Sequence, residues 1–329
     1  MKKLKLVFAA LSVLTIAGCG GGGGSDTAAN NKDLPTVAFL QIVSSAPLDE
    51  TRQGYLRGLE ENGFKDGVNF KFEYKNAEGD IPTAQLIARE FAGRNVDILG
   101  VSSSPALQSA IRATKDIPIV FCGVADPASA GAIKDGKQVA NVTGVSNPDP
   151  IEKSQALLKE LMPQVKVVGT LYDPSEPFIP LFRDRSRIAS AKLGFERVEI
   201  SVNNSNDITT GVQALKARGV QAIMQLPNNV TAAGAEAQIK AANEAGIPYL
   251  STHPGTVPLG GVAALGWDYE QAGYDAGVYA AQVLKGKKTS ELPIKSVEKE
   301  DLVINLPVAT KFGIKIPKAV LDRADKVIK

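Results

Sequence analysis

The order of predicted secondary-structure elements occurs twice along the chain, and this repeat limits the possible folds more than any other feature. A buried strand at 36–43 (TVAFLQIV) matches one at 165–172 (VKVVGTLY), and 117–121 (IPIVF) matches 247–251 (IPYLS). In each half the order is strand, helix, strand, helix, strand, turn, helix, strand. Self-similarity over such a length indicates internal duplication. Continuous apolar strands that alternate with helices predict parallel sheets covered on both faces.

The repeat predicts an α/β fold of two doubly wound lobes that are joined by a three-segment hinge and face each other across a cleft. A Pro-rich break, Ser146 to Pro150 (SNPDP), ends the first half. Residues 35–146 are therefore expected to form the first lobe and residues 147–254 the second. Residues 255–290 are expected to return to the first lobe, and residues 291–329 to the second.

The N-terminus predicts export and a lipid anchor. Lysines at positions 2, 3 and 5 precede an apolar run that is too short to span a bilayer, so residues 1–18 are expected to be a signal peptide. The sequence Ile16 to Cys19 (IAGC) resembles the lipobox of bacterial lipoproteins, which implies that Cys19 is lipidated. The alternative is an ordinary signal peptide with an accidental cysteine. Residues 19–34 begin with GGGGGS after Cys19 and are expected to be a flexible tether.

Composition excludes several function classes. The formal charge of +2 falls to −1 when the three signal-peptide lysines are removed, so nothing favours a nucleic-acid partner. The chain has one histidine and two cysteines without clustered ligand spacing, so neither a metal nor a cofactor is expected. Cys122 lies in an apolar strand and is expected to be a buried structural thiol. A monomer is expected.

The segment from Val96 to Pro127 predicts a turn that can bind an anionic group. A buried strand ends in a Ser-rich turn, and a helix is expected to open at Pro105 with Ser104 as its N-cap. Unpaired backbone N–H groups at a helix N-terminus favour an anionic group, and ligands bind at the carboxyl ends of parallel strands. Ser103 and Ser104 are therefore candidates to bind a ligand carboxylate. The alternative is that Ser104 only caps its helix.

The ordered set of short motifs resembles the substrate-binding lipoproteins of bacterial ABC importers, the family that includes tryptophan- and tyrosine-binding proteins. The resemblance covers about Pro35 to Ile328 and implies a periplasmic-binding-protein fold of type 1 without catalysis. The matching pieces are Gln41 at a strand end, DIPIVF (116–121), DP (126–127), NVTGV (141–145), LGWDY (265–269), LVIN (302–305) and IKIP (314–317).

Strand ends that face the expected cleft supply the remaining candidates. Asp126 could accept from a ligand ammonium or cap the next segment, and Tyr172 could stack on a ligand ring or belong to the core. Relatives often carry an acidic residue at the position of His253, and an acidic residue and a histidine where Ser44-Ser45 stand. These departures count against an aromatic amino acid as the solute. The full candidate set is Gln41, Ser44, Ser103, Ser104, Asp126, Tyr172, Asn228, Asn229 and His253.

These features together predict a solute-binding lipoprotein of an ABC importer. It would capture a small, carboxylate-bearing solute such as an amino acid and deliver it to the permease subunits. It would be anchored on the extracytoplasmic side of a bacterial membrane. A membrane-tethered sensor with the same fold is an alternative. A hydrolase is a weaker one, because it would need Ser104 and His253 as nucleophile and base, and the turn lacks the G-x-S-x-G pattern. No enzymatic activity is expected.

Overall fold

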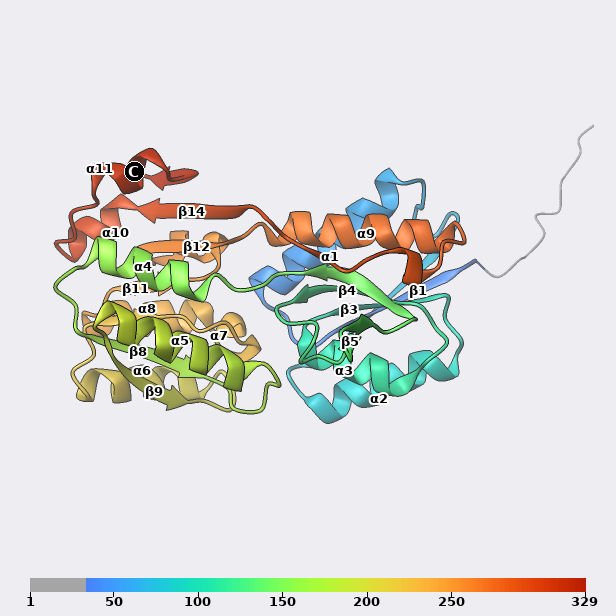
Figure 1. The fold of residues 1–329 in the computed structure, drawn as a ribbon, viewed down its shortest axis with the longest axis horizontal. Helices are drawn as coiled ribbons and strands as arrows, with labels where there is room; N and C mark the ends of the chain where they lie inside the picture. Colours follow the sequence, from blue (N-terminus) through green and yellow to red (C-terminus); the bar gives the residue numbers. More distant parts are fainter. Residues whose placement is uncertain (1–33) are drawn as a thin grey trace, which may run out of the picture. The chain divides into compact units, whose positions relative to one another are not determined.

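The computed structural model describes residues 34–329, which form one compact unit. The predicted signal peptide and Cys19 lie outside the described residues, as does the tether up to residue 33. Within 34–329, no helix has the length and apolar character that a membrane span requires. The unit contains two large β-sheets with helices on both faces (Figure 1).

The first sheet is parallel throughout, as the repeat predicts. Helices α1 (Ala46–Glu61) and α9 (Tyr269–Leu284) contribute to the core on one face of this sheet, and α2 (Ile81–Gly93) and α3 (Ser104–Ala113) contribute to the core on the other. In spatial order its strands are β13 (Lys295–Ser296), β7 (Val142–Ser146), β4 (Ile119–Val124), β3 (Ile98–Ser102), β1 (Thr36–Gln41) and β2 (Lys71–Asn76).

The second sheet repeats this order, so the predicted duplication is confirmed. All its strand pairs are parallel except β12 with β14. In spatial order its strands are β15 (Lys326–Ile328), β14 (Glu300–Asn305), β12 (Ala263–Trp267), β11 (Tyr249–Ser251), β10 (Ala222–Met224), β8 (Val167–Tyr172) and β9 (Glu196–Ser201). Its helices are α4 (Ile151–Leu161), α5 (Ile179–Leu193), α6 (Asp207–Ala217), α7 (Asn229–Ala233), α8 (Ala235–Ala245), α10 (Leu306–Lys311) and α11 (Lys318–Asp322).

Three small elements complete the described chain. The β5–β6 hairpin lies between β4 and β7, η1 follows β11, and η2 precedes β13. Their bounds are β5 (Ile133–Lys134), β6 (Lys137–Gln138), η1 (Pro254–Leu259) and η2 (Thr289–Glu291).

The observed crossings between the lobes correct the predicted boundaries. Residues 255–290 do not return to the first lobe as a block, because β12 pairs in parallel with β11 and stays in the second sheet. The return starts only at α9, which packs against α1. Within 291–329, β13 pairs with β7 in the first sheet, and β14 then enters the second sheet. The chain therefore crosses at 147–150, at 268 and at 297–299.

The central segment differs by one residue from its sequence prediction. Helix α3 begins at Ser104 rather than at Pro105, and Ser103 instead of Ser104 occupies the N-cap position. Cys122 is fully buried in β4, as expected, and burial raises the pKa of its thiol. The carboxyl ends of the first sheet's strands, and of β8 to β12 in the second sheet, point toward the region between the lobes, whereas β14 and β15 run the other way. A ligand site is expected at these carboxyl ends.

Candidate functional site

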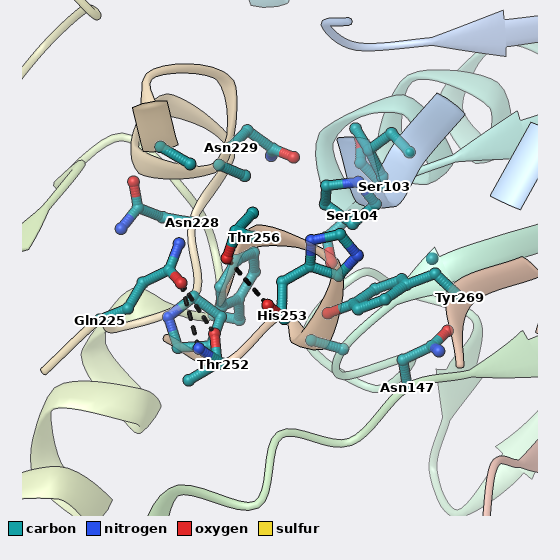
Figure 2. A pocket seen from close by; sticks show the side chains of 18 residues that line it. Ser103, Ser104, Asn147, Gln225, Asn228, Asn229, Thr252, His253, Thr256 and Tyr269 are labelled. Atoms are coloured by element: carbon teal, nitrogen blue, oxygen red, sulfur yellow. Dashed lines mark hydrogen bonds between the residues drawn. The ribbon is translucent and has the colours of Figure 1, made fainter. Parts of the chain in front are cut away.

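A cavity of about 70 Å³ lies between the two lobes. This is several times the ~10–15 Å³ that one water molecule needs. Figure 2 shows side chains from both lobes around it. No aspartate or glutamate is among the residues that line it: Pro47, Leu48, Ser103, Ser104, Gly123, Ala125, Asn147, Phe178, Gln225, Pro227, Asn228, Asn229, Ala232, Ala235, Thr252, His253, Thr256 and Tyr269.

The Ser103-Ser104 turn forms the polar part of the first lobe's wall. Both hydroxyls are buried, and neither has a hydrogen-bond partner among the described residues. The N-cap residue Ser103 makes no side-chain cap, so the interpretation of these serines as helix caps is not supported. The first turn of a helix also leaves backbone N–H groups without intrahelical partners, and these two serines begin that turn in α3. Buried polar atoms normally find partners, so this turn is suited to a ligand carboxylate.

The backbone of Ser103 is held in a strained conformation. Its φ of +92° and ψ of 157° lie in a region that only glycine adopts readily. Strain of this kind costs about 1–3 kcal/mol and persists where the surroundings enforce it. The Ser103 N–H donates to the carbonyl of Cys122 at 3.3 Å, which ties the turn to the neighbouring strand β4. This hydrogen bond helps to hold the turn in its strained conformation.

Two asparagines and a glutamine form the opposing wall on the second lobe. Asn228 caps α7, because its Oδ1 accepts from the N–H of Thr231. Asn229 donates its backbone N–H and its Nδ2 to Glu176, at 2.6 and 2.8 Å. Gln225 Oε1 accepts from Ser251 and from Thr252. Burial raises the pKa of Glu176 to about 8, although the donors from Asn229 oppose this shift.

His253 joins the two lobes at the base of the cavity. It follows β11 in the second lobe, and its Nε2 lies 2.9 Å from Oε2 of Glu50 on α1 of the first lobe. The ring of Tyr269 packs edge-on against the imidazole, with centroids 5.1 Å apart. His253 Nδ1 is buried and has no hydrogen-bond partner among the described residues. The Ser104–His253 hydrogen bond that a hydrolase would need is not formed.

The first crossing segment contributes a polar residue that sequence reasoning missed. Asn147 lines the cavity, and both polar atoms of its buried side chain lack partners within the described chain. The one signal in the sequence is its place in the Pro-rich break, which marks the end of the first half. Phe178, Gln225, Thr252, Thr256 and Tyr269 also line the cavity and were not among the candidates.

The predicted site residues divide into two groups. Ser103, Ser104, Asn228, Asn229 and His253 lie together around the cavity. The other four side chains do not line it. Gln41 binds Asp49 and Arg52, the exposed Ser44 binds Asp49, Asp126 Oδ1 accepts from the N–H of Ala128, and the Tyr172 ring lies 4.0 Å from the guanidinium carbon of Arg183. The side chains of Gln41, Ser44 and Asp126 are thus hydrogen-bonded within the first lobe, and the Tyr172 ring is covered by Arg183.

The described residues contain no group of three or more His, Cys, Asp or Glu side chains that could hold a metal ion. The cavity itself offers hydroxyls, amides, one imidazole and the apolar surfaces of Leu48, Phe178 and Tyr269. This arrangement can bind a small polar solute by hydrogen bonds, and it encloses that solute between two lobes.

Comparison with known proteins identifies the family. The family described as ABC transporter substrate binding protein matches residues 36–328. The chain belongs to this family. It is 33% identical over 311 residues to the tyrosine-binding protein of Clostridioides difficile (strain R20291), covering 92% of this chain and 90% of that protein. The resemblance deduced from the short motifs is thus confirmed.

Two solved structures are similar to this substrate-binding protein over most of its length. A Streptococcus pneumonia ABC domain in complex with L-Trp is 31% identical, with a TM-score of 0.84 over 90% of this chain and 100% of that one. A ligand-free, open substrate-binding protein from Clostridium difficile is 32% identical over 90% of this chain and 99% of that one, yet its TM-score is 0.66. Identity and coverage are nearly equal, and the structural similarity is higher to the L-Trp complex than to the ligand-free, open protein.

Asp149 in the first crossing segment makes stability depend on pH. Burial raises the pKa of its carboxyl to about 8, with Arg185 opposing the shift, whereas the unfolded chain titrates near pH 4. The folded protein therefore holds a proton that the unfolded chain releases. This favours folding in full below about pH 4, and the benefit is lost as the pH rises to 8.

We expect Asp149→Asn to flatten this part of the pH dependence of the free energy of unfolding. The variant should match the wild type near pH 4 and be more stable than it at pH 8.5, as measured by urea unfolding at both values. Asp116→Asn, in the exposed turn before β4, is the matched control and should keep the wild-type slope. An unchanged slope in Asp149→Asn would contradict the assignment. Glu176 contributes a slope of the same sign in all three proteins.

Proposed function

We propose that this substrate-binding protein captures an amino acid in the interlobe cavity and delivers it to the permease subunits of an ABC importer. The protein would act on the extracytoplasmic side of a bacterial membrane, tethered through a lipid on Cys19. The observation that carries the proposal is the pair of unpartnered, buried hydroxyls of Ser103 and Ser104 at the N-terminus of α3. These groups suit the carboxylate of the solute.

Contacts from both lobes provide the reason for closure. The carboxylate side of the cavity belongs to the first lobe, and Asn228, Asn229 and Thr252 belong to the second. A solute that touches both walls binds the closed form more tightly than the open form, and that difference drives closure. A closed form with an enclosed solute is the form expected to dock on a permease.

The arrangement of the cavity bears on the chemical class of the solute. Ser44 and Ser45 were two of the residues that counted against an aromatic amino acid as the solute. Neither lines the cavity, so neither argues against direct contact with an aromatic solute there. Phe178, Tyr269 and Leu48 provide apolar surface for a side chain. One relative is solved in complex with L-Trp, and another is named a tyrosine-binding protein. L-tryptophan and L-tyrosine are therefore the first solutes to test.

The test has two parts. Mass spectrometry of protein purified without denaturation should detect a retained amino acid, and isothermal titration should give micromolar or tighter binding for at least one of the twenty amino acids. Each tenfold gain in affinity corresponds to about 1.4 kcal/mol. Retention of a sugar or nucleoside, with no binding of any amino acid, would overturn the proposed solute class.

A further inference from the structure

We propose that Glu50 fixes the tautomer of His253 across the two lobes, so that the ring presents a bare Nδ1 as the acceptor for the amino group of the bound solute. The inference rests on the proposed function, and it assigns the recognition of the second polar group of an amino acid. Glu50 is then a positioning residue that acts through His253.

The geometry holds the imidazole tightly. His253 is 4% exposed, and its Nε2 lies 2.9 Å from Oε2 of Glu50. Tyr269 packs against the ring. The backbone of Gly255 packs closely against both side chains. A Cβ at this position would lie 2.8 Å from Cε1 of His253 and 3.0 Å from Oε1 of Glu50. The ring therefore has little freedom to rotate, and the identity of the atom that faces each neighbour is fixed.

The chemistry of the pair determines where the ring proton lies. An ionised carboxylate only accepts hydrogen bonds, so the Nε2 that faces Glu50 must carry the hydrogen. In the neutral ring the other nitrogen, Nδ1, is then a bare acceptor, because the hydrogen bond made by one nitrogen sets the state of the other. Nδ1 is buried and has no partner among the described residues. Such an atom is expected to find a donor in the bound solute.

The other acceptors of the cavity strengthen this assignment. No carboxylate lines the cavity, so a solute ammonium must be met by neutral acceptors. Oε1 of Gln225 and Oδ1 of Asn228 already accept from protein donors, which leaves His253 Nδ1 and Asn147 Oδ1 as buried acceptors without a partner among the described residues. His253 Nδ1 is unoccupied and has a carboxylate directly behind its ring.

Closure of the lobes completes this acceptor. Glu50 lies on α1 of the first lobe, and His253 lies at the end of β11 in the second. When the lobes are apart the carboxylate cannot select the tautomer. The amino group would therefore be bound fully only in the closed form, which adds to the preference of the solute for that form.

A nitrogen NMR experiment tests the tautomer directly, because His253 is the only histidine in the chain. The full chain, labelled with ¹⁵N-histidine, is measured with saturating L-tryptophan, or with whichever of the twenty amino acids binds most tightly. We expect one tautomer with the proton on Nε2 and a pyridine-type shift at Nδ1. Glu50→Gln can both accept and donate and should give a mixture. Glu50→Lys, which only donates, should favour the proton on Nδ1.

Affinity supplies the second measurement. Glu50→Gln should weaken L-tryptophan binding by about 10-fold and leave binding of indole-3-propionate, which lacks the amino group, nearly unchanged. Glu60→Gln, exposed on the same helix, is the matched control and should change neither quantity.

The outcomes separate the two proposals. A proton on Nδ1 in the wild-type complex would overturn this inference and leave amino acid binding intact. The same holds if Glu50→Gln weakens both probes equally, because Glu50 would then act on closure alone. If no amino acid binds to the wild type, both proposals fail.

Discussion

Replacement of Ser103 by glycine is expected to stabilise the substrate-binding protein and to weaken its solute binding at the same time. The φ of +92° at Ser103 is unfavourable for a residue with a Cβ and costs about 1–3 kcal/mol. Glycine removes that cost but gives the unfolded chain more freedom, by about 0.5–1 kcal/mol. The serine hydroxyl has no partner among the described residues, so its removal sacrifices no internal hydrogen bond. We expect a net gain near 1 kcal/mol in the unfolding free energy.

The loss of affinity should be larger than the gain in stability. A hydrogen bond from the Ser103 hydroxyl to a solute carboxylate contributes about 1.5–3 kcal/mol, so the affinity should fall by about 10- to 150-fold. Urea unfolding without solute and isothermal titration with the bound amino acid measure the two effects. The change of both quantities in opposite directions distinguishes a binding residue from a residue that only shapes the turn.

Two matched variants separate strain from contact. Ser103→Ala keeps the strained backbone and loses the hydroxyl, so it should weaken binding without the gain in stability. Ser109→Ala, in the second turn of α3, removes a hydroxyl that donates to the carbonyl of Pro105 at 2.8 Å. It should lower stability by about 1 kcal/mol and leave affinity unchanged. Wild-type affinity in Ser103→Gly would show that this hydroxyl does not contact the solute.

The duplicated order of elements was sufficient to predict the lobes, because strand order in such folds follows from chain order and right-handed crossovers. The point of the second crossing was not predictable from it. The short β12 looks like the start of a returning segment. One of its partners, β11, is the preceding strand, but the other, β14, lies beyond α9 and β13 in the sequence. Nothing in the local pattern of β12 shows that it stays in the second sheet.

The sequence predicts the site residues whose position follows from the backbone alone. It does not predict which side chains are taken up by partners that are distant in the sequence. The position of Ser103 and Ser104 follows from a strand that meets a helix N-terminus. Gln41 and Tyr172 also end strands, but Asp49 on α1 and Arg183 on α5 occupy their polar or aromatic surfaces. These pairings depend on how helices pack on the sheet. The partnership of Glu50 with His253 bridges the lobes, and no spacing in the sequence indicates it.

A stripe of small residues holds together the part of the first lobe that supports the cavity, and Gly54→Ala should disrupt it. Helices α1 and α9 meet at glycines on both sides, Gly54 and Gly58 on α1 and Gly273 and Gly277 on α9. A Cβ on Gly54 would overlap the backbone carbonyl oxygen of Glu270 and come within 2.8 Å of the backbone nitrogen of Tyr274. Backbone atoms cannot rotate away as a side chain can. We expect a loss of about 3 kcal/mol in the free energy of unfolding, at the upper end of overpacking effects.

The same change should also reduce solute affinity at temperatures where the variant is still folded. Helix α1 carries Leu48 and Glu50, and α9 begins at Tyr269, so a displacement of α1 from α9 moves two walls of the cavity relative to each other. Gly93→Ala is the matched control, because a Cβ at this end of α2 has no neighbour within 4 Å. It should be neutral or stabilise by up to about 1 kcal/mol through helix propensity. Equal stability of the two variants would mean that the helices can separate without cost. A loss of both stability and affinity that is confined to Gly54→Ala would show that backbone contact between α1 and α9 sets the geometry of the cavity.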